Sequence, residues 1–444
     1  MHFNKILISI LLLSGMPGFA LALPPSPVFV RILHTNDLHS KFRPERGALG
    51  LGGVARIKTL INAIRSSDPD ALVVDGGDWS EGDIYYRVGL GRESLRFMDL
   101  MGYDLAVVGN HDWLNGPARL VQAVQEADLK MKVLAANVNL DQYAGAEEFR
   151  KTIPPYVIRE VKGVKIAFIG AITFEFFYKS FFQQAQITIP SHQFRRLVKW
   201  LKNEVDAIVV VSHNKIEFNE SLMKAIPDID LIVGAHDHVK LTQPIAVSRG
   251  KKRPKGWIVE AGAWGHYLGE TVIEVQPRTR DSGAPEDFNG KSQVRGAAYR
   301  LIEVNASIPE DPEVLKRIAT LECQIESEMG EAVFHDQVGT SEIDFPMWDG
   351  ERVLAHLVTD SYRTLTGADI GFEHFPFIYA NLPAGEIRTA DAYNVLAPIY
   401  DPESESTWKV QTFEMKGIHL FAWLNLLFAP KSGVMGEEVA GSMS

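Results

Sequence analysis

The chain has 444 residues, 46% hydrophobic and 23% charged, so it can bury large apolar cores and is neither disordered nor fibrous. Its 45 Lys and Arg against 56 Asp and Glu give a formal net charge of −11. This balance argues against binding to a nucleic-acid duplex or an anionic membrane surface. The single cysteine, Cys323, excludes an intramolecular disulfide.

Residues 1–22 are typical of a cleavable signal peptide. Lys5 precedes the apolar run Ile6–Leu13, and Ala20-Leu21-Ala22 has the form of a cleavage site. The run is far shorter than the ~20 residues that span a bilayer. We therefore expect a periplasmic or secreted mature protein without a membrane span.

Short apolar runs with strand character follow, separated by segments of helical spacing. Between the first two runs, Val54, Ile57, Ile61 and Ile64 recur at the period of a helix. This alternation predicts a layered α/β domain up to about residue 280. The predicted strands are Val28–Leu33, Ala71–Val74, Leu105–Val108, Val133–Ala136, Val164–Ile169, Ala207–Val211 and Leu231–Val233.

The rest of the chain predicts a loop, a helix and a second unit. Residues 281–296 are rich in Gly, Ser, Asp and Asn, which is typical of a loop, and a strand-like segment covers 297–304. Pro309 to Pro312 then opens a helix that ends near Glu328. We accordingly divide the mature chain into a first domain (23–305), a linker helix (306–330) and a C-terminal α/β domain (331–444).

Five polar clusters stand where the predicted strands end, which is the edge at which open α/β sheets bind ligands. Helix capping explains a lone Asp or Asn, but it does not require the imidazoles found in four of the clusters. Imidazole mixed with carboxylate and amide suits zinc, manganese, iron or cobalt better than calcium or magnesium alone. The candidate residues are Asp37, His39, Asp78, Asn110, His111, His213, His236 and His238.

The order of these clusters resembles the calcineurin-like metallophosphoesterases, and within them the exported 5'-nucleotidases. The family blocks D-x-H, G-D, G-N-H-(D/E), H and G-H-x-H all occur in order, with Ala235 inserted in the last block. Gly52–Arg56 is similar to a helix start of that group. The resemblance covers residues 30–275 well and 308–428 loosely. It implies a β-sandwich flanked by helices, with a smaller substrate domain.

The resemblance also implies a role for each candidate. Asp37, His39 and His238 would hold one divalent metal, Asn110, His213 and His236 a second, and Asp78 would bridge them. Two cations ~3.5–4 Å apart activate a bridging hydroxide for in-line attack on phosphorus. His111 would protonate the leaving oxygen. Asp75 and Asp112 would orient ligands.

One departure concerns His111. In the 5'-nucleotidases, the G-N-H-(D/E) block is followed by an aromatic residue and then by an Asp or Asn that orients the catalytic histidine. Here Trp113 is followed by Leu114. Either Asn115 takes that role or His111 works unassisted.

The C-terminal unit departs further. The family's Asn-Gly-Gly-x-x-Arg is replaced by Gly371–Tyr379, whose four aromatics could stack a base or belong to a core. After Phe428 only a short polar tail follows, so we expect a shortened or truncated substrate domain.

These observations predict an exported two-metal phosphoesterase that hydrolyses phosphomonoesters, with 5'-nucleotides as the leading substrates. Cyclic nucleotides, nucleotide sugars or a sulfur-linked group are alternative substrates. A weakly catalytic binding protein on the same fold is the other alternative. The sequence does not predict the native metal or the oligomeric state.

Overall fold

The computed structural model describes residues 26–47, 50–174, 185–250, 254–277, 294–347, 353–374, 377–397, 400–401, 406–407, 409–427 and 439–443. The expected signal peptide and most of the expected loop at 281–296 lie outside these residues. Within the described ranges, no helix combines the length and apolar character needed to cross a membrane.

Two six-stranded sheets form the first unit, and all seven predicted strands belong to them. The first sheet has the order β14 (Val294–Glu303), β13 (Tyr267–Val275), β1 (Val28–Thr35), β2 (Leu72–Asp75), β3 (Leu105–Val107) and β4 (Lys132–Leu134). The second has the order β11 (Ile245–Val247), β12 (Gly256–Val259), β10 (Leu231–Ala235), β9 (Ala207–His213), β7 (Val164–Ala171) and β6 (Tyr156–Val161). Strands β1 to β4 run parallel, as do β7, β9, β10 and β12.

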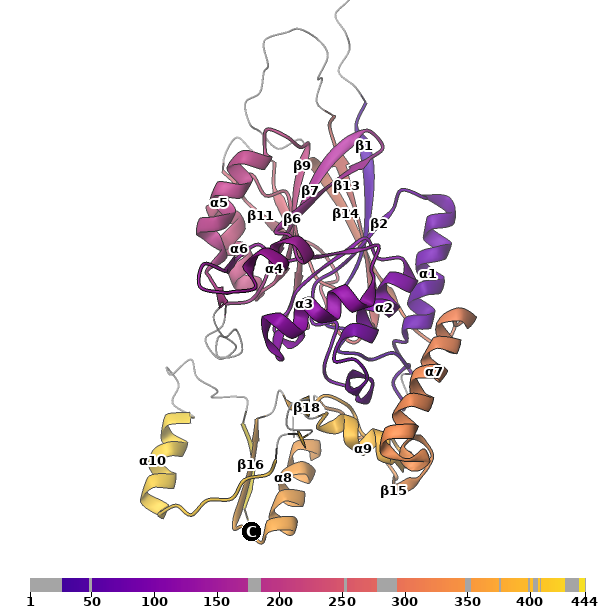
Figure 1. Ribbon diagram of the computed structural model, residues 1–444, viewed down its shortest axis with the longest axis vertical. Helices are drawn as coiled ribbons and strands as arrows, with labels where there is room; N and C mark the ends of the chain where they lie inside the picture. The colour runs from indigo at the N-terminus through magenta and orange to yellow at the C-terminus, as the bar shows by residue number, and fades with distance from the viewer. Residues whose placement is uncertain are drawn as a thin grey trace, which may run out of the picture.

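The sheets pack face to face, which confirms the expected sandwich (Figure 1). Val30 and Val74 of the first sheet share one buried cluster with Phe168, Val209 and Val233 of the second. The outer face of the first sheet is covered by α1 (Val54–Ser67), α2 (Arg92–Met101), α3 (Gly116–Ala127) and α4 (Ala146–Thr152). Helices α5 (Pro190–Leu201) and α6 (Ile216–Ala225) cover the second. A short ladder joins β5 (Val138–Asn139) to β8 (Gln186–Ile187).

The helix expected to link the two units packs on the first one. Helix α7 (Pro312–Met329) starts at Asp311, whose carboxylate accepts hydrogen bonds from the backbone N–H groups of Glu313 and Val314. Its apolar stripe, which includes Ile318 and Ile325, is buried in the same cluster as α1 and α2. Burial of this stripe fixes the start of the second unit against the first.

The second unit is small and has its own core. Its elements are η4 (Glu331–Phe334), β15 (Gln337–Ser341), α8 (Val353–Thr366), β16 (Ile370–His374), β17 (Gly385–Arg388), α9 (Thr389–Val395), β18 (Tyr400–Asp401), β19 (Ser406–Thr407), α10 (Gly417–Leu427) and β20 (Val439–Met443). Leu354, Ile378 and Leu382 lie in its core, and Trp264 of the first unit packs against it. The two units therefore share an apolar contact.

Candidate metal centre

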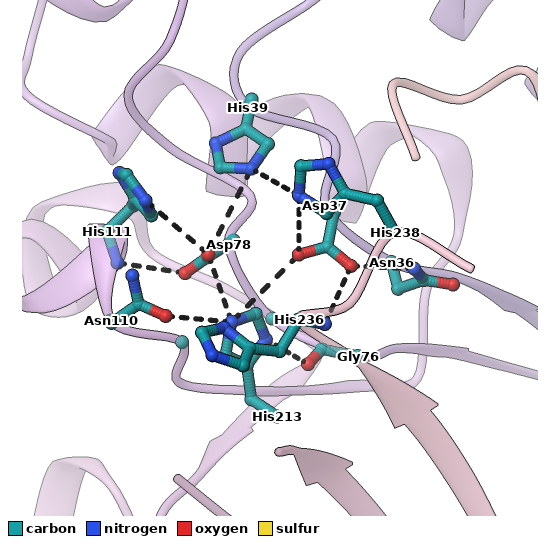
Figure 2. A network of polar contacts seen from close by, with 12 residues as sticks. Asn36, Asp37, His39, Gly76, Asp78, Asn110, His111, His213, His236 and His238 are labelled. Carbon is teal, nitrogen blue, oxygen red and sulfur yellow. Dashed lines mark hydrogen bonds and ion pairs between the residues drawn. The ribbon is translucent and has the colours of Figure 1, made fainter. Parts of the chain in front are cut away.

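The eight candidate residues come together at one edge of the sandwich, although they come from five separate segments of the chain (Figure 2). Asp37 and His39 follow β1, Asp78 follows β2, and Asn110 follows β3. His213 ends β9, and His236 and His238 follow β10. Three groups of side chains have ligand atoms within 4.8 Å of one another and could hold a metal ion: Asp37, His39 and His238; Asp78, His213 and His236; and His39, Asp78 and His111.

Backbone hydrogen bonds hold the first two loops against each other. The N–H of Asp37 donates to Gly77 O and the N–H of His39 donates to Asp78 O, both at 2.9 Å. Asp37, His39 and Asp78 have left-handed φ values of 52°, 47° and 55°. Non-glycine residues rarely adopt these conformations, so the backbone of both loops is held in an unusual shape beside the site.

Asp78 lies in the middle of the cluster. Its Oδ1 accepts the backbone N–H of His111 at 2.8 Å. Its Oδ2 lies 3.0 Å from His213 Nε2 and 4.0 Å from Nε2 of both His39 and His111. The carboxylate is almost fully buried. A buried anion surrounded by imidazole nitrogens is suited to join two cations.

Hydrogen bonds to carbonyl oxygens orient two of the imidazoles. Nδ1 of His39 donates to Glu81 O at 3.0 Å, and Nδ1 of His213 donates to Gly76 O at 2.9 Å. Because a carbonyl oxygen only accepts, the proton resides on Nδ1 and Nε2 points into the site as a potential ligand. Asn110 Oδ1 lies 3.1 Å from His213 Nε2.

Asp37, His39 and His238 form the other half of the cluster and also bring imidazole and carboxylate groups together. His238 Nε2 lies 3.3 Å from His39 Nε2 and 3.4 Å from Asp37 Oδ1. Asp37 Oδ1 is buried and makes no hydrogen bond within the described residues, while Oδ2 accepts the N–H of His236 at 3.0 Å. Two imidazole nitrogens that face each other beside an unbonded carboxylate oxygen fit a divalent cation between them.

Burial and charge act in opposite directions on these imidazoles. Burial, aided by nearby His111, lowers the pKa of His39 to about 3 and keeps that ring neutral. Burial would lower the pKa of His213 as well, but the Asp78 carboxylate and its hydrogen bond raise it to about 10. A cation bound there would release that proton.

Asp75 and Asp112 accept hydrogen bonds from the backbone of the loops that carry the candidates. Asp112 Oδ2 accepts the N–H groups of Asp78 and Gly109 at 2.9 and 2.8 Å. Asp75 Oδ1 accepts the N–H of Gly77 at 2.9 Å. Gly109 has to be glycine, since a Cβ there would lie 2.0 Å from Asp78 Oδ1.

Glu81 also lies in the site, although the sequence did not predict it there. Its Oε2 accepts a hydrogen bond from His111 Nδ1, so His111 is not unassisted. Asn115 does not take this role, because its amide donates to the hydroxyl of Tyr86. Burial would lower the pKa of His111, but the charges of Asp78 and Glu81 raise it to about 9. Two sequence features could have pointed to Glu81: Leu114 stands where the family has Asp or Asn, and an acidic residue lies three positions after Asp78.

The second unit reaches the site through Tyr379. The centre of its ring lies 6.2 Å from that of His39 and 6.1 Å from that of His111. Tyr379 also lines a cavity of about 1280 Å³ in the second unit, together with Phe372, Phe377 and Tyr393. Phe375, another aromatic of the same segment, lies outside the described residues.

Comparison with known proteins agrees with this geometry. Residues 30–240 match the family model of the calcineurin-like phosphoesterases. The 5'-nucleotidase of Bos taurus is 28% identical over 316 residues, which are 65% of this chain and 51% of that protein. The chain thus spans about half the length of the curated relatives it matches.

Two solved structures from Thermus thermophilus share the fold. A 5'-nucleotidase precursor superposes with a TM-score of 0.71 at 22% identity, covering 83% of this chain and 74% of that one. The sulfate thiohydrolase SoxB superposes with a TM-score of 0.68 at 18% identity, covering 85% and 75%. The family-model match and the curated 5'-nucleotidase relatives support the calcineurin-like metallophosphoesterases as the family of this chain, and the solved structures share its fold.

Proposed function

We propose that this protein is an exported two-metal phosphoesterase that hydrolyses 5'-nucleotides to nucleoside and phosphate. The observation that carries the proposal is Asp78, a buried carboxylate with imidazole Nε2 atoms on several sides. The curated relatives named 5'-nucleotidase support the choice of substrate. The N-terminal sequence, of signal-peptide type, supports export.

We assign Asp37, His39 and His238 to one metal, Asn110, His213 and His236 to a second, and Asp78 to both. Two of the groups with converging ligand atoms support this division. When bound, such a pair of cations polarises a phosphoryl oxygen and lowers the pKa of water. Imidazole, carboxylate and amide ligands together suit zinc, manganese, cobalt or iron.

His111 is the proposed general acid. Its Nδ1 is held by Glu81, and its Nε2 faces the site 4.0 Å from Asp78 Oδ2. From this position Nε2–H can donate its proton to the ester oxygen as the bond to phosphorus breaks. His111 also belongs to a group with ligand geometry, together with His39 and Asp78.

A substrate panel with metal-loaded protein tests the proposal. We expect turnover of 5'-AMP and p-nitrophenyl phosphate, and little with 2',3'-cyclic AMP, a nucleotide sugar or a thiosulfonate. Asp78→Asn should lose both bound metal, measured by elemental analysis, and turnover, whereas the exposed Asp70→Asn should keep both. Full metal content and normal turnover in Asp78→Asn would contradict the assignment. Preference for another substrate of the panel would replace the nucleotide assignment.

A further inference from the structure

The carboxylate of Glu81 is buried and makes one hydrogen bond within the described residues. The side chain is 1% exposed and lies in the loop after β2. Oε2 accepts from His111 Nδ1, while Oε1 is buried and makes no hydrogen bond within the described part of the chain. Burying a carboxylate is costly unless a donor or a positive charge compensates it. The His111 imidazole is the partner that the structure provides.

The Glu81 backbone is fixed as firmly as its side chain. Its φ of 60° is left-handed, and its carbonyl accepts from Nδ1 of His39 at 3.0 Å. The next residue, Gly82, packs so closely that a Cβ there would lie 2.9 Å from the Cβ of His39. One residue thus contacts both rings, His39 through its carbonyl and His111 through its carboxylate.

Position 114 provides no carboxylate. Leu114 is buried and apolar, and the amide of Asn115 bonds to Tyr86. We propose that Glu81, and not a residue after Trp113, is the carboxylate that positions His111 for proton donation. This inference rests on the proposed function, since it concerns the leaving-group step of that reaction.

Water loses one proton to the solvent, and its oxygen forms a new bond to phosphorus as the bond from phosphorus to the ester oxygen breaks. The proton on His111 Nε2 passes to that ester oxygen, so the alcohol leaves neutral. The Glu81 carboxylate keeps Nδ1–H hydrogen-bonded, which holds Nε2 toward the ester oxygen.

Leaving-group dependence separates positioning from a purely structural role. 5'-AMP releases a basic alkoxide that needs a proton, whereas p-nitrophenyl phosphate releases a weakly basic phenolate. Glu81→Gln should therefore lower kcat for 5'-AMP by about 10–100-fold, with little change in KM. Turnover of p-nitrophenyl phosphate should fall by less than about threefold. His111→Asn should show the same pattern with a larger loss, about 10²–10⁴-fold for 5'-AMP.

The matched control is Glu93→Gln, which alters another buried glutamate that is paired with Arg96 and Arg317 away from the site. It should change turnover of both substrates by the same factor or leave both unchanged. Equal loss on both substrates in Glu81→Gln, no loss at all, or reduced metal content would overturn the proposal.

A second experiment introduces a carboxylate at position 114. Leu114→Asp should raise 5'-AMP turnover in the Glu81→Gln background and leave wild-type turnover unchanged. An equal rise in both backgrounds would show that Glu81 does not already fill this role. If the double variant does not fold, as judged by thermal unfolding, the Glu81→Gln comparison decides.

A readout besides activity keeps the inference distinct from the proposed function. In the zinc-loaded protein, the Nδ1–H proton of His111 should give a strongly downfield NMR signal, assigned by its loss in His111→Asn. Glu81→Gln should shift that signal upfield. If the wild type hydrolyses neither substrate, the proposed function fails, and an unshifted signal separately overturns the contact.

Discussion

Five of the seven candidate ligands adopt left-handed backbone conformations, which L-residues rarely do. Asp37, His39, Asp78, His236 and His238 have φ values between 47° and 87°. Each such residue costs of the order of 1–3 kcal/mol unless its surroundings compensate. Cations that bind only the folded site would supply that compensation. Metal removal should therefore lower stability as well as activity.

Chelation tests this coupling. EDTA should abolish phosphoesterase activity and lower Tm, because the ligands would lose their common partner while the strain remains. Manganese, cobalt or zinc should restore both quantities, since imidazole nitrogen suits these ions. Activity assays and differential scanning fluorimetry on the same samples measure the effect. Recovery with calcium alone would contradict a site built on histidine.

The convergence of the candidate ligands was predictable from sequence because each lies at or after the end of a strand with a clear apolar pattern. Asp37, Asp78 and His213 sit at or just after the ends of parallel strands, so topology alone brings them to one edge. Glu81 could not be assigned in this way. Its role depends on the turn at Gly82 and on how far the loop folds back over His39, which are tertiary features.

Asp83 should make stability depend on pH. Burial raises its pKa to about 6, against the lowering effect of Lys41 with Nζ at 3.8 Å. The folded state therefore binds more protons than the unfolded state between about pH 4 and 6, and stability falls as pH rises through that window. One pKa unit corresponds to about 1.36 kcal/mol, so this rise in the pKa of Asp83 lowers the free energy of unfolding by about 3 kcal/mol across the window.

Asp83→Asn removes this titration. The free energy of unfolding of the variant, taken relative to wild type, should be about 2–3 kcal/mol higher at pH 7.5 than at pH 4. Urea unfolding at both pH values measures the difference. Asp70→Asn, an exposed aspartate, is the control and should show no such trend. Equal effects of Asp83→Asn at the two pH values would contradict the prediction.

At the scale of elements, strand β13 shows where sequence patterns were insufficient. It pairs with β1 and β14 inside the first sheet, yet no strand was predicted there. Glu270 interrupts its apolar pattern but is 4% exposed, because Arg31 and Arg300 pair with it from the two neighbouring strands. In the sequence alone, an acidic residue at this position predicts an exposed site, because the arginines that neutralise it lie on other strands.

Arg249 connects the start of β10 to the connection between β11 and β12, and we expect its loss to lower stability strongly. Its buried guanidinium pairs with Asp230 at 2.7 Å and donates to the carbonyls of Ile229, Pro254 and Lys255. Arg249→Met should reduce the free energy of unfolding by about 3–5 kcal/mol, because buried Asp230 loses its ion pair with Arg249.

Chemical denaturation compares this variant with Lys224→Met. Lys224 forms an exposed pair with Glu220 on α6, so its loss should cost less than about 0.5 kcal/mol. A loss below 1 kcal/mol for Arg249→Met would show that the buried pair does not stabilise this edge.

At the scale of the whole molecule, contacts between the two units place part of the second unit beside the candidate metal centre. Asn394 Oδ1 accepts the N–H of Ile84 at 2.8 Å, and Arg46 pairs with Asp391 and donates to Glu386 O. These contacts, with the packing of Trp264, hold Tyr379 beside His39 and His111. The sequence predicted a second unit but not this placement, since the polar contacts join residues more than 300 positions apart.

The aromatics of the second unit separate into packed and available rings. Phe372 contacts Trp423 edge to face, with ring centres 5.1 Å apart. Phe413 lines the same cavity but is 70% exposed. A ring that already packs against another contributes to stability, whereas an exposed ring in a cavity is available to stack a base.

Phe413→Ala should therefore raise KM for 5'-nucleotides by a factor that corresponds to about 1–3 kcal/mol, without changing Tm. Phe372→Ala should lower Tm, because it removes a packed ring. The control is Phe421→Ala, which removes a ring that is 66% exposed on α10 and does not line the cavity. KM for p-nitrophenyl phosphate should stay constant in Phe413→Ala, since that substrate has no base. If KM for 5'-AMP, 5'-GMP and 5'-CMP is unchanged in Phe413→Ala, the cavity does not read the base, and specificity must come from residues nearer the metal centre, such as Tyr379.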